Sequence, residues 1–241
     1  MMFYIPAPYF CIKYRNELMA PFVPTYQIDG IDLSAFGIRI AASRGVLDLP
    51  SMKQPQTYDW PDYHGVTVDL EKPRFNPNHI ILDAWMESSD GMLEFAKRIR
   101  SFYNTMTKPG LRQLLVFIGE NHPLVFMVYM KDGMDVQKKW NDIRMFGTFQ
   151  IKLEEPEPVK MVVRFESGST VSSVSFASND FFNVYWGDGT VSYDIDGVSI
   201  TGIPGIKLNH NFPAPGTYFA CVCGNIDSIT SFSTTGTVIW Q

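Results

Sequence analysis

Several signals that identify common protein classes are missing from this 241-residue chain. Its three cysteines are an odd number and give no disulfide framework, which suits a reducing compartment. Charged residues make up only 19% and the net charge is −5, so the overall balance attracts neither nucleic acid nor an anionic membrane. The longest apolar runs, such as Leu124–Met130, fall far short of the roughly 20 residues of a membrane-spanning helix. The N-terminal segment lacks a basic stretch followed by an apolar run, so we expect no signal peptide.

Motifs for catalysis and for metal binding are missing as well. The four histidines follow no metal-ligand spacing, and no P-loop, GxSxG or GxGxxG string occurs. Cys221 and Cys223 share one face of an expected strand, but even with His210 they offer three ligands where a structural zinc site uses four. The sequences Asp188-Gly189 and Asp194–Gly197 fit hairpin turns better than calcium loops. We therefore expect buried thiols, no metal, no cofactor and no enzymatic activity.

The chain does have a large stock of apolar side chains. Hydrophobic residues make up 45% and aromatic residues 14%, enough for a sizeable core. One helix is predicted over about residues 90–107, because apolar residues recur there at spacings of three and four. Other segments read as strands: Tyr26–Ile28, Ile38–Ala41, Ile80–Met86, Leu114–Ile118, Leu124–Tyr129 and Phe149–Leu153. The pattern predicts a mainly β fold with one helix.

The run Glu154-Glu-Pro-Glu-Pro158 marks a predicted domain boundary. Its prolines cannot continue a strand ladder, so we expect a stiff linker whose carboxylates, Glu154, Glu155 and Glu157, are solvated. Beyond it, serine, threonine, glycine and aromatic residues dominate. Short strands are expected at Lys160–Phe165, Val171–Phe176, Phe182–Trp186, Val198–Thr201 and Thr217–Val222. The chain thus divides into residues 1–157 and residues 158–241, the second part a small antiparallel sandwich.

The first part carries short motifs near its start. The segment Tyr26-Gln-Ile-Asp-Gly30 is followed by Phe36-Gly37-Ile38, with Gly30, Phe36 and Gly37 as motif residues. These segments resemble the opening turn and the [F/L]-G-[I/L/V] segment of the distal tail protein family of tailed bacteriophages. The resemblance covers about residues 20–157, through the helix to the exit at Phe149–Pro156. Trp60-Pro-Asp-Tyr-His-Gly65 stands where the family has an acidic, glycine-bearing loop, although Pro61 is not followed by Gly and Arg.

The resemblance implies a split β-barrel with one helix, of the kind found in tail tube and baseplate hub proteins. It implies a homo-oligomer, a hexameric ring at the far end of the tail tube, with no catalysis. Its partners would be other tail proteins of a phage or prophage, namely the tail tube, the baseplate hub or a fibre. Its place would be the virion tail, after synthesis in the host cytoplasm.

The second part resembles a PKD-like β-sandwich. The motif residues are Trp186, Gly187, Asp188 and Gly189 of a W-G-D-G-T hairpin, with His210, Gly216 and Tyr218 further along the chain. The resemblance implies that Trp186 anchors the core, that Asp188-Gly189 forms a tight turn, and that Tyr218 packs against the opposite sheet. Modules of this kind serve in spacing or surface attachment.

Two functions from different classes remain open. A ring adaptor needs apolar surfaces that are buried only in the assembly, and an acidic chain lets DNA pass without sequence-specific binding. The segment Thr217–Val222, apolar on both faces, invites a partner or a second sheet. The alternative is a surface adhesion or carbohydrate-binding protein that uses the sandwich. Exposed rings among Trp60, Tyr63, Trp186 and Tyr193 would favour the alternative.

Overall fold

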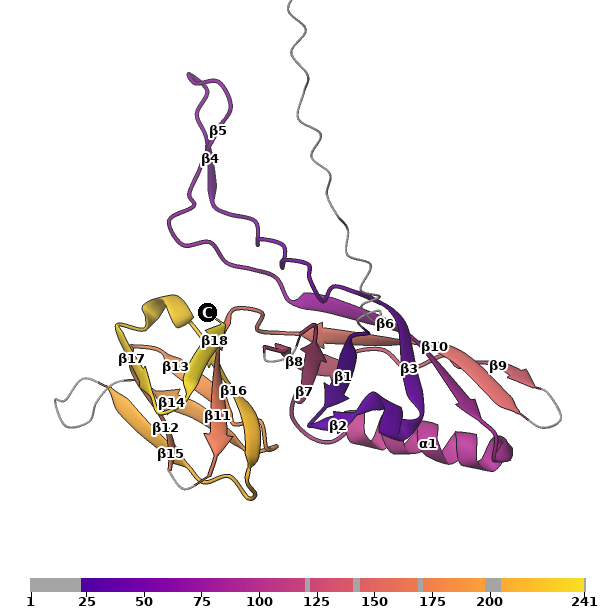
Figure 1. The fold of residues 1–241 in the computed structure, drawn as a ribbon. Coiled ribbons are helices and arrows are strands. Elements are labelled where there is room, and N and C mark those ends of the chain that lie inside the picture. Colours follow the sequence, from indigo (N-terminus) through magenta and orange to yellow (C-terminus); the bar gives the residue numbers. More distant parts are fainter. Residues whose placement is uncertain (1–22, 120–121, 141–143, 169–170, 198–204, 241) are drawn as a thin grey trace, which may run out of the picture.

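A computed structural model describes residues 23–119, 122–140, 144–168, 171–197 and 205–240 (Figure 1). The third cysteine of the sequence, Cys11, and the strand predicted at 198–201 lie outside these residues. Within them, no helix combines the length and apolar character needed to cross a membrane.

The N-terminal half is built on one eight-stranded antiparallel sheet. Its strands run in the order β2-β1-β7-β8-β10-β6-β3, with β9 paired to β10. Their bounds are β1 Thr25–Ile28, β2 Ile31–Asp32, β3 Ile38–Arg44, β6 Asn78–Ser88, β7 Arg112–Phe117, β8 Leu124–Met130, β9 Gln137–Trp140 and β10 Met145–Glu155.

The long strand β10 joins the two parts of this sheet. It pairs with β6 along its whole length but with β8 only at Leu153 and Glu154. The path ends at β2 and β3, which share no backbone pairing among the described residues. The hydroxyl of Tyr26 on β1 donates to Ser43 Oγ on β3 at 3.0 Å. The mainly β class with one α-helix is confirmed for the described residues, while backbone pairing does not close the sheet into a barrel.

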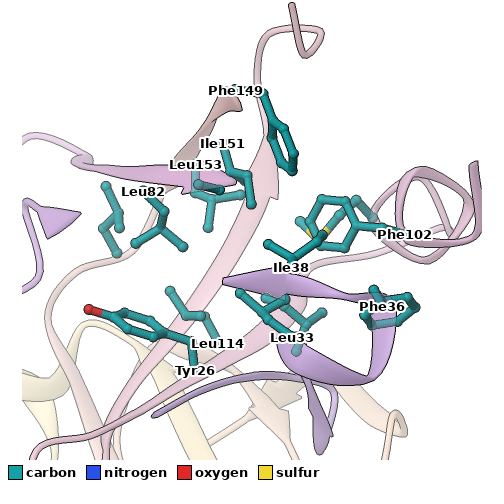
Figure 2. Packing of buried hydrophobic residues seen from close by; sticks show 14 of the residues in the cluster. Tyr26, Leu33, Phe36, Ile38, Leu82, Phe102, Leu114, Phe149, Ile151 and Leu153 are labelled. Atoms are coloured by element: carbon teal, nitrogen blue, oxygen red, sulfur yellow. The ribbon is translucent and has the colours of Figure 1, made fainter. Parts of the chain in front are cut away.

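The single helix, α1 Gly91–Met106, matches the prediction over 90–107. It packs against β6, β10 and the short 3₁₀ turn η1 Leu33–Phe36. Phe102 is fully buried and meets Phe36 edge to face, with 5.7 Å between ring centroids. Figure 2 shows these two rings beside Ile38, next to the aliphatic side chains of β6, β7 and β10. The helix thus covers one end of the N-terminal core.

The C-terminal half consists of two facing sheets. A five-stranded sheet runs β14-β13-β16-β11-β18 and a three-stranded one runs β15-β12-β17. Trp186, Phe176 and Phe182 are the largest side chains buried between them. The strand bounds are β11 Lys160–Ser167, β12 Ser172–Ala177, β13 Phe181–Tyr185, β14 Val191–Asp196, β15 Ile206–His210, β16 Gly216–Gly224, β17 Ser231–Thr234 and β18 Thr237–Trp240. A 3₁₀ turn, η2 Ile226–Ser228, precedes β17.

The predicted linker at Glu154–Pro158 requires a correction. Strand β10 continues through Glu154 and Glu155, which pair with His79 and Asn78 of β6. Both side chains are buried, Glu155 with 1% of its surface exposed. Glu157 is half-buried. The prolines act only from residue 156 onward, and Lys131 and Lys160, brought close by the tertiary fold, allow Glu154 and Glu155 to leave water.

The two halves share a hydrophobic cluster. Leu115, Val125 and Met127 of the N-terminal sheet pack against a second group of buried side chains. That group comes from the five-stranded sheet and comprises Val162, Tyr185, Phe219, Cys221 and Cys223. Gln113 Nε2 donates to Phe219 O at 2.6 Å within this cluster. The second apolar face of β16 is therefore covered by the N-terminal half of the same chain.

Candidate assembly surfaces

A long arm, residues 47–75, leaves the N-terminal sheet between β3 and β6 (Figure 1). Its two short strands, β4 Thr57–Asp59 and β5 Val66–Val68, pair only with each other. Apolar side chains project from the arm into solvent. They are Leu47, Leu49, Met52, Tyr58, Trp60, Tyr63, Val66, Val68 and Leu70. A two-stranded hairpin is at best marginally stable alone in water, and a contiguous apolar surface of this kind marks an interaction site.

The base of the arm is fixed to the body of the protein. Gly45 has φ +82, and a β-carbon there would lie 1.9 Å from His79 O, so no other residue fits. Asn78 Nδ2 donates to Gly45 O at 3.3 Å. Arg74 Nη1 donates to Asn225 Oδ1 of the C-terminal half at 2.8 Å. The arm therefore leaves the body in a set direction.

A second apolar surface is a groove of about 680 Å³ beside α1, here called the helix groove. One wall is the outer face of α1, where Leu93 is 70% exposed and Met92 53% exposed. The other wall is the segment from Gly133 to Lys138. The charged side chains that line the groove are Lys97, Arg100 and Lys138. The sheet thus covers only part of the apolar face of the helix, and the rest of that face lines the groove.

The N-terminal motif residues have local structural roles. Gly30, with φ +77, turns the chain from β1 into β2. Phe36 is buried against Phe102, and Gly37, with φ +76, ends the turn η1. A β-carbon at Gly37 would lie 3.2 Å from Arg98 Nη1 of α1. These residues hold the start of the sheet against the helix.

The hairpin motif of the sandwich forms one connected cluster. Trp186 is buried and stacks on His210 at 4.6 Å between ring centroids. His210 Nε2 lies 2.8 Å from Asp188 Oδ2, and Thr190 N donates to Asp188 Oδ1 at 2.9 Å. Burial alone would raise the pKa of Asp188, but the hydrogen bonds from Thr190 and His210 bring it below its ordinary value. Gly189, with φ +89, completes the turn.

The ring contacts continue from His210 to the start of β16. Phe212 stacks on Tyr218 with centroids 4.1 Å apart, and the Tyr218 hydroxyl donates to Ala214 O at 3.1 Å. A β-carbon at Gly216, the first residue of β16, would lie 3.6 Å from Cε2 of the Tyr218 ring. The structure thus brings the C-terminal motif residues together. Phe36 and Gly37 lie apart from them at the turn η1, whereas Gly30 lines the same groove as Gly187 to Gly189.

Three of the four rings named for the adhesion alternative are exposed, as that alternative expects, but Tyr193 is the one of them that lies exposed on the sandwich. Trp60 and Tyr63 are exposed on the arm, whereas Trp186 is buried in the sandwich core. Tyr193 is exposed but meets Tyr185 edge to face at 6.3 Å. Of the four rings that could have formed a carbohydrate platform, the sandwich therefore exposes one.

The cysteines of β16 are packing residues. Both are fully buried, and loss of hydration raises the pKa of each thiol, that of Cys221 to about 12. His210 belongs to the Trp186 cluster inside the sandwich, and the cysteines belong to the cluster between the halves. Across the ranges that the structure describes, no three His, Cys, Asp or Glu side chains are placed to hold a metal ion.

A groove of about 640 Å³ with both polar and apolar lining residues lies between the two halves. Gly30 and the hairpin residues Gly187 to Gly189 line it. Its main charged groups already have partners, because Arg112 Nη1 lies 3.0 Å from Asp29 Oδ2 and Asp188 is held by His210. The arrangement serves to join the halves and presents no activated nucleophile or base among the lining residues.

Comparisons with known proteins give one structural similarity to report. No family profile and no curated protein matches the chain. A crystal structure of SPP1 Dit, described as a paradigm of hub adsorption apparatus in Gram-positive infecting phages, is similar to it. The TM-score is 0.41 at 11% sequence identity, over 82% of this chain and 79% of that chain. A similarity of this size carries no conclusion about shared activity.

Proposed function

We propose that the chain is a structural component of a phage or prophage tail. It forms a ring that joins the tail tube to the distal baseplate or adsorption apparatus. The observation that carries this proposal is the arm, whose apolar side chains are exposed on a single chain. An arm built in this way is stable only when another surface covers it.

The motif pattern around Gly30 and Phe36-Gly37 supports a ring of six copies, and the charge of the chain fits passage of DNA. A net charge of −5 repels phosphates, which keeps the nucleic acid from sticking. In the W-G-D-G-T cluster, His210 stacks on Trp186 and its Nε2 lies 2.8 Å from Asp188 Oδ2, so these polar side chains serve in packing. The ring is proposed to work by position alone, without catalysis.

The test compares the wild-type protein with an arm-less variant. Asn76 N donates to Ser51 O at 2.8 Å, so the two legs of the arm are adjacent there. Replacing residues 52–75 with Asn-Gly closes this pair with a two-residue hairpin turn and leaves the body intact. Light scattering over a concentration series, with negative-stain images, measures the assembly state, and circular dichroism checks the fold.

We expect the wild-type protein to form open-centred, six-fold rings and the arm-less variant to stay monomeric with an unchanged spectrum. Rings of the arm-less variant would show that the arm does not carry assembly. A wild-type protein that is monomeric at every concentration contradicts the proposal. Glycan and cell-surface binding would then be measured, since the adhesion alternative predicts them.

A further inference from the structure

The arm and the helix groove are two apolar surfaces that the described part of the body leaves uncovered. We infer that they bind each other between copies: the arm of one copy lies in the helix groove of the next. This inference rests on the proposed ring and deepens it by naming the two surfaces in contact. It assigns the groove beside α1 to a segment of a second copy of this chain.

The two surfaces are complementary in charge. The arm tip, residues 54–70, carries Asp59, Asp62 and Asp69 and has no lysine or arginine. The helix groove is lined by Lys97, Arg100 and Lys138, with no carboxylate among its lining residues. Of these cations, Lys97 has a partner at 3.9 Å, the half-buried Glu94. Opposite charges around apolar centres are the usual arrangement at protein interfaces, where they set register and exclude wrong partners.

The surfaces are also complementary in chemistry at their centres. The groove offers aliphatic and thioether side chains, among them Leu93, Met92 and Met134. The arm tip offers the rings of Tyr58, Trp60 and Tyr63. Aromatic anchors in pockets lined by methionine and leucine are typical of energetically important interface positions, and methionine adapts its shape to the ring it receives.

The position of the two surfaces excludes contact within one chain. The arm projects from one side of the N-terminal sheet, and α1 lies on the opposite side (Figure 1). Each leg of the arm is about 15 residues long, so an extended leg reaches up to about 50 Å, more than the diameter of a small domain. An arm that binds the opposite side of a neighbour makes a head-to-tail interface, and repetition of that interface gives a ring when the rotation between successive copies closes.

Charge reversal on each surface tests the pairing. The arm variant is D59K/D62K/D69K, and the groove variant is R100E/K138E. Lys139→Glu is the matched control, because neighbouring residues of a strand face opposite sides and Lys138 alone of the two lines the groove. Each reversed surface meets like charge in the next copy. The mass of the assembly formed by either variant alone should therefore be about sixfold lower, that of a single copy instead of a ring. The control should form rings.

Mixing the two variants provides the decisive measurement. The reversed arm fits the reversed groove, and the unchanged arm of the second variant fits the unchanged groove of the first. A ring with an even number of copies can alternate between them, so the equimolar mixture should recover rings that neither variant forms alone. Failure of the mixture to recover rings overturns the inference, as do rings formed by either variant alone.

Cross-linking gives a second measurement that does not depend on charge. In a Cys11→Ser background, copies with Tyr63→Cys are mixed with copies carrying Leu93→Cys and oxidised; a disulfide dimer of the two is expected. Val171→Cys, exposed on the sandwich, replaces Leu93→Cys in the control and should give no dimer. Wild-type rings without the Tyr63–Leu93 cross-link overturn the inference and leave the proposed function standing. A wild type that never assembles overturns both.

Discussion

Gly187 shows how a single missing side chain positions the sandwich hairpin. Its φ is +88, and a β-carbon there would lie 2.6 Å from the backbone oxygen of Phe219 on β16. The backbone of the hairpin can approach β16 this closely only with glycine at this position. Gly189 has the same left-handed conformation, φ +89, but open space around its Cα.

This difference gives a paired prediction at the residue scale. Gly189→Ala should cost about 1–2 kcal/mol of stability, because it suffers only the strain of the left-handed backbone. Gly187→Ala should cost about 1–3 kcal/mol more, because the methyl group also forces the hairpin from β16. Urea unfolding followed by tryptophan fluorescence measures both. Equal losses of stability in the two variants would show that β16 can move away from the added methyl group without a loss of stability.

At the scale of the element, the end of β10 and the start of β11 form a buried ionic contact. Glu155 Oε1 accepts from Lys160 Nζ at 2.6 Å and from Met127 N at 3.1 Å. Burial raises the pKa of Glu155 above its ordinary value, and Lys160 and the hydrogen bonds partly offset this effect. Lys131 forms a similar contact with Glu154 at 2.6 Å, but its side chain is 55% exposed.

The loss of stability on removal of Lys160 should therefore be large and should depend on pH. Lys160→Met leaves Glu155 buried without its cation and should cost about 3–5 kcal/mol near pH 7.5. A carboxyl group whose folded pKa is raised supports the fold fully below its unfolded pKa, and this support is lost as pH rises through the folded pKa. The defect should thus shrink as the pH falls from 8 toward 4.

Urea titrations at several pH values measure this effect. Lys131→Met is the control, with a smaller loss expected because Lys131 is half exposed and Glu154 keeps the hydrogen bond from the Tyr129 hydroxyl. The double variant Glu155→Gln/Lys160→Met should recover much of the stability, because it buries no unpaired charge. A Lys160→Met defect that is independent of pH would show that packing of the lysine stem, rather than its charge, is what matters.

At the scale of the whole molecule, the cluster between the halves determines how the protein unfolds. Leu115 and Met127 face Cys221 and Phe219 across the junction, and Trp240 Nε1 of β18 donates to Pro123 O of the N-terminal half at 2.9 Å. An apolar contact of this kind couples the stability of the parts that it joins.

We expect one calorimetric transition for the wild-type protein. Leu115→Asp, which places a charge in the apolar junction, should divide the transition into two or lower the unfolding temperature of both halves together. Leu115→Met keeps the volume and polarity and should leave a single transition near the original temperature. Two separate transitions in the wild type would show that the halves are independent.

Local signals in the sequence determined the helix and most of the strands. The three- and four-residue spacing of apolar side chains over residues 90–107 predicts α1 to within one residue at each end, because a helix with one buried face needs that period. The strands around Ile28, Ile80, Val125 and Ile151 follow from alternation and β-branched content. Glycine turns, as at Gly30, are equally local.

Only the tertiary structure decided which surfaces are covered. The prolines of Glu154–Pro158 predicted a solvated linker, but burial of Glu155 depends on Lys160 and on β6, both outside the motif. The sequence shows that β16 is apolar on both faces, yet not that the N-terminal half covers one of them. The arm gives no periodic signal, because no core of its own chain buries its apolar side chains, which stay exposed. Burial is a property of long-range neighbours, so residue spacing specifies an apolar face but not its partner.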